Sequence, residues 1–173
     1  MREQKHWLKF IFSGDDRVDG TKVFNPERVR MEVGKHPQVR LSLRADGRNT
    51  SIKSGDILYI VAYATDSAGK KRVFIVARGI LDDLMTDVNY YDEIFGFFES
   101  DSFEYLNAPI ENCIDLQGLW DKYGNKAFPN SEAGSLKAVY SQANYVALTE
   151  KAGEWIDDNF FNMLGSPEIS AVV

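Results

Sequence analysis

Runs of hydrophobic residues divide the chain into a series of expected strands. Residues 6–12 are rich in aromatic and β-branched side chains, and residues 39–44 alternate apolar positions with polar or basic ones, which is the period of a half-buried strand. Residues 57–63 and 73–77 are almost continuously apolar, as in strands that are covered on both faces. A polar segment joins these two runs, so they predict a central hairpin. A shorter strand is expected over residues 145–148.

Three segments carry the start and stop signals of helices. Residues 25–27 read Asn-Pro-Glu, a typical N-terminus, and a glycine soon afterwards makes this helix short. Asp115 is placed to cap a helix that ends at Gly124 and carries on one side Leu116, Leu119, Trp120 and Tyr123. Thr149 precedes a last helix, also with an apolar stripe, that ends near Gly165.

The order of these elements indicates an α+β fold. Consecutive strands with short connections favour antiparallel pairing, and closure into a small barrel leaves no exposed sheet edge. The expectation is a small, mixed but mainly antiparallel β-barrel with flanking helices, formed by residues 1–173 as a single domain. Residues 83–106 are acidic and aromatic, and part of this segment is expected to be helical, although Gly96 interrupts its pattern.

Composition narrows the class of protein. Hydrophobic residues make up 44% of the chain and charged residues 27%, which is typical of a globular domain. Cys113 is the only cysteine, so no intramolecular disulfide is possible and nothing points to an oxidising compartment. The apolar run near the charged N-terminus includes Lys9 and is too short for a signal sequence or a membrane span. The expectation is a cytoplasmic protein without a membrane partner.

Charge is distributed unevenly along the chain. The net charge is −6, yet residues 1–80 contain sixteen basic against nine acidic residues, and residues 81–173 contain four against seventeen. Such an asymmetry suggests that one surface meets a polyanion while another stays in solvent. The alternative is that the two halves interleave in space and their charges mix. The sequence leaves both possibilities open.

Two groups of basic residues are candidates for contacts to a nucleic-acid backbone. One group lies on and after the alternating strand, and the other lies at the tip of the predicted hairpin. Together they are Arg40, Arg44, Arg48, Lys53, Lys70, Lys71 and Arg72. Such side chains bind phosphates and position a protein on nucleic acid, so we expect them to share one face. The alternative is ordinary solvated charge, which also discourages strand-to-strand aggregation.

The sequence contains no recognisable catalytic or metal-binding motif. His6 and His36 are far apart, and neither has a partner at metal-ligand spacing. The acidic pairs at 82–83 and 157–158 are adjacent, so their side chains diverge in regular structure. A glycine-rich phosphate loop, a nucleophile elbow and a Ser/His/Asp set are also absent. These observations favour a binding module without cofactor, metal or catalytic residues over an enzyme.

Several segments resemble PUA-like domains, especially the EVE group and its ASCH and YTH relatives. Residues 54–60 and 74–80 are similar to the central hairpin of these families, in which a turn ending in Gly-Asp leads into a buried strand. The opening strand with Trp7, and residues 142–149 leading into the last helix, resemble an EVE-type beginning and ending. The chain departs from that pattern in the segment 83–106 and in lacking a tryptophan near the first helix.

The resemblance implies a small closed barrel with a pocket. This pocket lies between the end of the first strand, the central hairpin and the late strand, and in relatives it accepts a modified base, or the barrel binds RNA or DNA. A flipped base is read by stacking and by hydrogen bonds to its edge. Residues in matching segments with suitable side chains are Trp7, Phe24, Asn25, Tyr59, Tyr63, Arg78, Gln142, Asn144 and Tyr145.

Three functions from different classes are therefore carried forward. The leading hypothesis is a non-catalytic module that binds DNA or RNA and reads a modified base in the barrel pocket. The second is a small ASCH-like hydrolase or amidohydrolase that acts on a modified nucleoside, for which a buried lysine beside an acid would be the sign. The third is a protein-interaction domain that uses residues 83–106, for which a flat apolar patch would be the sign.

Overall fold

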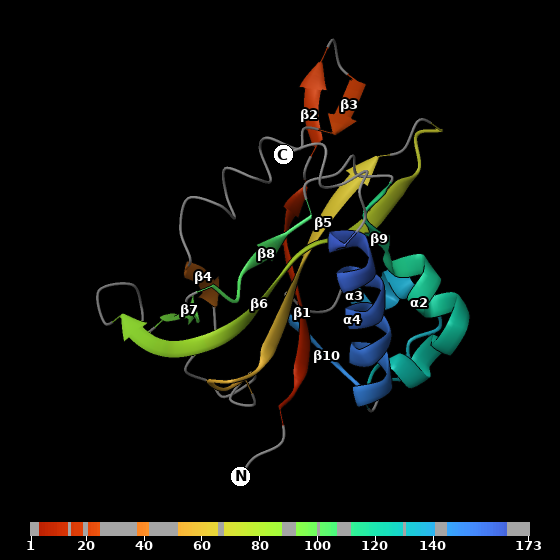
Figure 1. Cartoon of the computed structure of the whole chain (residues 1–173). Helices are drawn as coiled ribbons and strands as arrows, with labels where there is room; N and C mark the ends of the chain where they lie inside the picture. The colour runs from red at the N-terminus through yellow and green to blue at the C-terminus, as the bar shows by residue number, and fades with distance from the viewer. Residues whose placement is uncertain are drawn as a thin grey trace.

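A computed structural model of the chain describes residues 4–13, 15–18, 21–24, 38–41, 52–65, 68–87, 93–99, 101–106, 112–129, 131–140 and 145–165. These residues build a main mixed sheet with helices packed beside it, and a separate two-stranded hairpin (Figure 1).

The main sheet has the strand order β10-β1-β5-β6-β7-β4. Its members are β1 (His6–Ser13), β4 (Gln38–Leu41), β5 (Ile57–Thr65), β6 (Lys71–Asp87), β7 (Glu93–Phe98) and β10 (Tyr145–Leu148). β1 and β5 run parallel, with His6 opposite Ile57, and every other neighbouring pair in this order is antiparallel. The sheet is therefore mixed but mainly antiparallel, as expected from the sequence.

Strand β6 connects the two parts of this sheet. It has 17 residues, of which Lys71–Ile80 pair with β5 and Leu81–Asp87 pair with β7. A register shift between Leu81 and Asp83 marks the change of partner, because a bulge bends a strand and raises its twist. Two short strands, β8 (Glu104–Tyr105) and β9 (Ile114–Asp115), pair with the first part of β6. A separate hairpin joins β2 (Asp15–Val18) to β3 (Thr21–Phe24).

The helices gather beside β1, β5 and the first part of β6 (Figure 1). They are α2 (Leu116–Tyr123), the 3-10 turn η3 (Gly124–Ala127), α3 (Leu136–Tyr140) and α4 (Glu150–Leu164). The Asp115 side chain caps α2 by accepting from the Gln117 backbone N–H, and Thr149 caps α4 in the same way through Ala152. The apolar stripe of α4 buries Ile156 and Phe160 completely.

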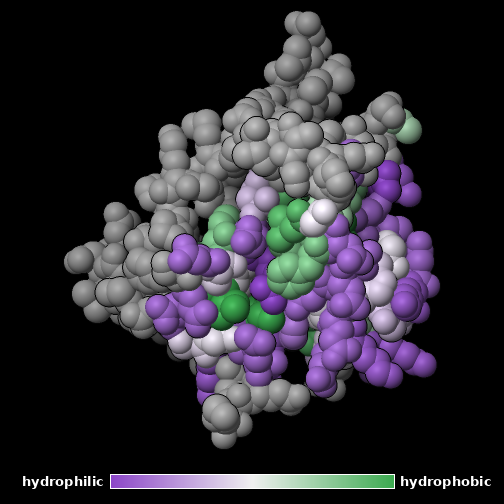
Figure 2. Space-filling model, viewed as in Figure 1, coloured by the Kyte–Doolittle hydropathy of each residue, from purple (hydrophilic) through white to green (hydrophobic). Residues whose placement is uncertain are grey.

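The buried core lies between the sheet and these helices. Its largest fully buried side chains include Tyr59, Leu58, Ile75, Leu119 and Phe160, which come from β5, β6, α2 and α4. The space-filling view shows a mainly hydrophilic surface around the helices, with a small hydrophobic patch near the centre of that face (Figure 2). None of the described helices is long and apolar enough to cross a membrane.

The structure confirms the α+β class, the mixed sheet, the flanking helices and the central hairpin. Residues 57–63 and 73–79 pair antiparallel, with Ile57 opposite Ile80 and Tyr63 opposite Val73. Closure into a barrel is not shown, because β10 and β4 stand at the two ends of the described strand order. The expected helix starting at residue 25 lies outside the described residues.

The expectation of helix within residues 83–106 is wrong for the part that the structure describes. There β6 continues to Asp87, and β7 and β8 follow as strands. The aromatic residues at 95, 97 and 98 favour a strand, and antiparallel pairing with β6 outweighs any local helical tendency. The alternating segment at 39–44 forms a strand as far as the structure describes it, since β4 covers Gln38–Leu41 and residues 42–44 lie outside the described residues.

Candidate functional site

Trp7 lies in the core rather than in an open pocket. Its indole N–H donates to Asp56 Oδ2 at 3.0 Å, and its residue is 6% exposed. The same carboxylate accepts from the backbone N–H groups of Lys5 (3.1 Å) and Lys53 (3.0 Å). These hydrogen bonds to Asp56 hold the start of β1 against the turn before β5. Trp7 is therefore a structural side chain and offers no face for stacking.

Tyr59 and Arg78 do come together, but around a carboxylate of α4. The Tyr59 hydroxyl donates to Asp157 Oδ1 at 2.6 Å, with the Gly153 carbonyl oxygen at 3.1 Å as a longer acceptor. Arg78 binds Asp157 through two hydrogen bonds, Nε to Oδ1 at 2.7 Å and Nη2 to Oδ2 at 3.2 Å. His6 Nδ1 lies 2.8 Å from the Tyr59 oxygen. These four side chains form the α4 anchor.

The environment fixes the charge states within the α4 anchor. Burial, followed by the charge of Asp157, raises the pKa of Tyr59, so this phenol stays neutral. Burial by itself lowers the pKa of Arg78, but the hydrogen bonds and the charge of Asp157 outweigh burial and the pKa is raised. Burial lowers the pKa of His6. The neutral Tyr59 and the Arg78–Asp157 ion pair therefore have a structural role, which is to hold α4 on the sheet.

Two further tyrosines predicted for the pocket also have partners. The Tyr63 ring lies against Phe10, with the Lys71 ammonium 4.5 Å from its centroid. Tyr145 is buried, and the Lys9 ammonium lies 4.2 Å from the centre of its ring. Burial lowers the pKa of Lys9 to about 8.

Three of the predicted pocket residues, Asn25, Gln142 and Asn144, lie outside the described residues, and so does the side chain of Phe24. The predicted pocket thus stays a prediction where it depends on them.

The predicted basic residues do not form one continuous group in the described part of the chain. Lys53 precedes β5, whereas Lys70 and Lys71 follow its far end. Arg44 and Arg48 lie outside the described residues, as does the side chain of Arg40. Two basic residues of the first half pair with acids of the second, Arg72 with Asp115 and Arg78 with Asp157. At these points the two halves interleave and their charges mix.

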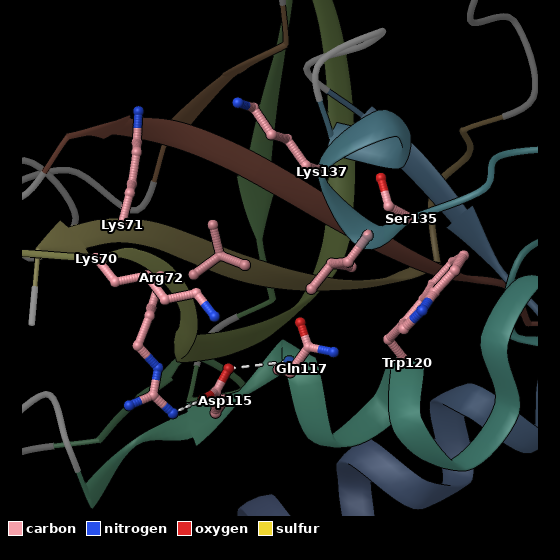
Figure 3. A pocket seen from close by; sticks show the side chains of 10 residues that line it. Lys70, Lys71, Arg72, Asp115, Gln117, Trp120, Ser135 and Lys137 are labelled. Atoms are coloured by element: carbon pink, nitrogen blue, oxygen red, sulfur yellow. Dashed lines mark hydrogen bonds and ion pairs between the residues drawn. The ribbon is translucent and has the colours of Figure 1, made fainter.

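The tip of the hairpin does open onto a cleft. This basic cleft has a volume of about 420 Å³ and lies between the start of β6, the start of α2 and α3 (Figure 3). It is lined by Lys70, Lys71, Arg72, Val73, Asp115, Gln117, Trp120, Ser135, Leu136 and Lys137. Four of these side chains are cationic and one is a carboxylate, so the lining is strongly basic in a chain whose net charge is −6.

Local interactions organise one wall of the basic cleft. Asp115 pairs with Arg72 through a carboxylate oxygen and caps α2 with the other, accepting from Gln117 at 2.9 Å. The Gln117 side-chain amide donates to Asp121 at 2.8 Å. The Trp120 ring stacks on Phe128 with centroids 6.3 Å apart. Arg72 and Trp120 are thus held in place at opposite ends of this wall (Figure 3).

Sequence reasoning identified the hairpin tip but missed the rest of the cleft. Trp120 was expected to belong to an apolar stripe, whereas the structure leaves it partly exposed on the cleft wall. Lys137 belongs to α3, a five-residue helix with only a weak local signal, and Ser135 directly precedes this helix. The one sequence cue was Ser135 itself, whose hydroxyl accepts from the Ala138 backbone N–H. Within the described ranges, no three His, Cys or acidic side chains gather as a metal-binding group.

Comparison with known proteins finds similarity to solved structures. No protein-family model matches the chain, and no curated protein matches it either. Among solved structures, the chain is similar to the human THYN1 protein, crystallised in complex with 5-methylcytosine containing DNA. The TM-score is 0.49 with 12% sequence identity, and the match covers 95% of this chain and 100% of the other. The DNA in that crystal is bound to THYN1.

Proposed function

We propose that this chain is a nucleic-acid-binding module that holds a phosphate backbone at the basic cleft. The observation that carries the proposal is the concentration of Lys70, Lys71, Arg72 and Lys137 around one concave surface of an acidic protein. A cleft lined by charge of one sign focuses the electrostatic potential and raises the local concentration of oppositely charged ligands. A polyanion is the class of ligand that such a surface attracts most strongly.

The cleft adds an aromatic wall to this charge. Trp120 stands beside the cationic rim, and side chains of this type bind nucleobases by stacking. A site for a simple anion needs no such wall. A basic groove next to an aromatic ring is the arrangement by which proteins bind single strands with little sequence preference. The combination therefore favours nucleic acid over a small inorganic anion.

Recognition of a modified base is the finer form of this proposal. Its support is the resemblance of residues 54–60 and 74–80 to the EVE group, stated above. Because Arg78 is committed to Asp157, a base-reading pocket in this fold would depend on groups other than its guanidinium. The test is to compare modified and unmodified oligonucleotides of one sequence at equal salt.

The enzyme alternative receives little from the described residues. The enzyme alternative called for a buried lysine beside an acid. Lys9 is buried with a lowered pKa, but its ammonium lies over the Tyr145 ring. The protein-interaction alternative depends on a flat apolar patch formed by residues 83–106. The side chains of 83–97 lie outside the described part, and among the described ones Phe98 and Leu106 are buried. Neither alternative has an observation as specific as the basic cleft.

The experiment is a binding screen with single- and double-stranded oligonucleotides at two salt concentrations. Lys71→Ala combined with Lys137→Ala removes two cations from the cleft. Lys126→Ala combined with Lys151→Ala is the control, since it makes the same charge change at exposed positions outside the cleft lining. We expect the cleft variant to lose about ten-fold or more in affinity at low salt while the control stays near the parent. Equal binding by the two variants would contradict the proposal.

A further inference from the structure

We infer that the basic cleft holds one unstacked nucleotide, with its base against Trp120 and its phosphate among Lys70, Lys71 and Lys137. This inference rests on the proposed function and deepens it. It assigns two ends to the cleft, a flat apolar end and a cationic end, and it names a nucleoside monophosphate unit as the ligand class that satisfies both.

Trp120 supplies the flat end. Its ring stacks on Phe128 and lies at one end of the cleft lining (Figure 3). The ring belongs to α2, which Asp115 caps and whose Leu116 and Leu119 are fully buried. A ring supported from behind on a fixed helix is presented for stacking without a large loss of side-chain freedom on binding. This is the property that a base-stacking platform requires.

The floor between the two ends is apolar. Val73 and Leu136 line the cleft between its cationic and aromatic side chains, and they are almost fully buried, at 2% and 6% exposed. A base and a sugar can cover this floor, whereas a bare phosphate ion cannot. The cleft volume of about 420 Å³ lies within the range of small-ligand sites, about 300–1,000 Å³. A single nucleotide therefore matches both the size and the polarity of the cleft.

Three lysines supply the cationic end. Lys71 and Lys137 stand on opposite sides of the cleft and extend in the same direction, while Lys70 reaches toward its middle (Figure 3). All three side chains are exposed. Arg72 is paired with Asp115, which offsets its charge and holds it at the wall. The Lys71 ammonium also lies over the Tyr63 ring, which positions this lysine beside the cleft. The exposed position of the three lysines on the cleft lining is what places them to bind a phosphate.

The geometry makes the site specific for a ligand with both parts. A nucleoside would use Trp120 and the floor but leave the lysines unneutralised, and inorganic phosphate would use the lysines alone. A nucleotide in an intact duplex has both faces of its base covered by stacking, so it cannot reach Trp120 without leaving the stack. The cleft therefore selects single-stranded, terminal or flipped nucleotides over paired ones.

The test uses adenosine monophosphate, adenosine and inorganic phosphate as probes, with binding followed through the Trp120 indole N–H signal by NMR. Trp120→Phe assigns the signal, and Trp155→Phe is the matched control because Trp155 packs against Gly118 outside the cleft lining. We expect the monophosphate to shift the Trp120 signal and to bind about ten-fold more tightly than adenosine or phosphate. The two Trp120 variants lack the indole signal, so their binding is measured by titration calorimetry. Trp120→Phe keeps much of this binding, whereas Trp120→Leu reduces it to the level of phosphate.

The outcomes separate this inference from the proposed function. If the monophosphate leaves the Trp120 signal unchanged, and oligonucleotides still lose affinity in the Lys71→Ala/Lys137→Ala variant, the single-nucleotide inference is wrong and the proposed function stands. If that double variant binds oligonucleotides as well as the parent does, both fail. The NMR signal is measured on the parent chain, so the test does not depend on the folding of Trp120→Leu.

Discussion

Asp157 shows how one side chain can join a helix to a sheet. It accepts hydrogen bonds from Tyr59 on β5 and Arg78 on β6, while its own backbone belongs to α4. The Arg78 and Asp157 side chains are only 11% and 21% exposed, so each charge depends on the other for solvation. Breaking a buried ion pair by removing one partner leaves an uncompensated charge, which is costly.

We expect Asp157→Ala to lower the free energy of unfolding by about 3 kcal/mol, because Arg78 would remain buried without its carboxylate. Asp158→Ala is the matched control, since its side chain is exposed and its removal should change stability by no more than about 0.5 kcal/mol. Urea unfolding of the three proteins measures the difference. Similar midpoints for both variants would show that the ion pair does not hold α4.

Lys9 gives the chain a pH dependence whose sign can be worked out. Burial lowers its pKa from 10.5 to about 8 in the folded state. Between these values the folded chain has released a proton that the unfolded chain still binds, so stability rises with pH in this window. We expect the free energy of unfolding to increase by up to about 2 kcal/mol between pH 8 and about pH 9.5.

Lys9→Met removes the titrating group and should flatten this rise, which unfolding curves at several pH values would reveal. Measurements stay below pH 10, because the raised pKa of Tyr59 acts in the opposite direction above that value. An equal rise in parent and variant would mean that another group is responsible.

At the scale of elements, the packing of α4 on β1 depends on the absence of one side chain. A Cβ atom at Gly153 would lie 2.4 Å from the His6 ring, which is far inside van der Waals contact. His6 is itself held by its contact with the Tyr59 oxygen. The glycine therefore lets helix and strand approach closely, although glycine inside a helix is normally unfavourable relative to alanine.

We expect Gly153→Ala to destabilise the protein by about 1–3 kcal/mol, in spite of the better helix propensity of alanine. In a His6→Ala background the same change should cost much less, because the ring that clashes is gone. A double-mutant cycle by thermal or urea unfolding measures this coupling. Additive effects of the two substitutions would contradict the close approach described here.

The elements that the sequence predicted correctly have strong local signals. The central hairpin follows from two long apolar runs, and α4 follows from its Thr149 cap and apolar stripe. The parallel pairing of β1 with β5 and the change of partner along β6 depend on contacts between segments far apart in the chain. No local pattern encodes such pairings, which is also why helix was expected in part of residues 83–106, where the described residues form strands.

At the scale of the whole molecule, the candidate site is a product of the tertiary fold. Its lining comes from residues 70–73, 115–120 and 135–137, which the sheet and the helices bring together. The sequence supplied the lysines of the hairpin tip as candidates but gave no sign that Trp120 and Lys137 would face them. Charge asymmetry between the two halves was also a poor guide, because Arg72 and Arg78 pair with acids of the second half.

The salt dependence of oligonucleotide binding tests the central claim most directly. Lysines that neutralise phosphates release counterions, so log K falls linearly with log salt, by about 0.7 per phosphate contact for single strands. For Lys71→Ala/Lys137→Ala the account predicts weaker binding to all sequences and a slope smaller than that of the parent by about 0.7, since the two lysines bind the same phosphate, with Lys126→Ala/Lys151→Ala unchanged. A parent chain that binds no oligonucleotide at low salt, or a cleft variant with the slope of the parent, would contradict it.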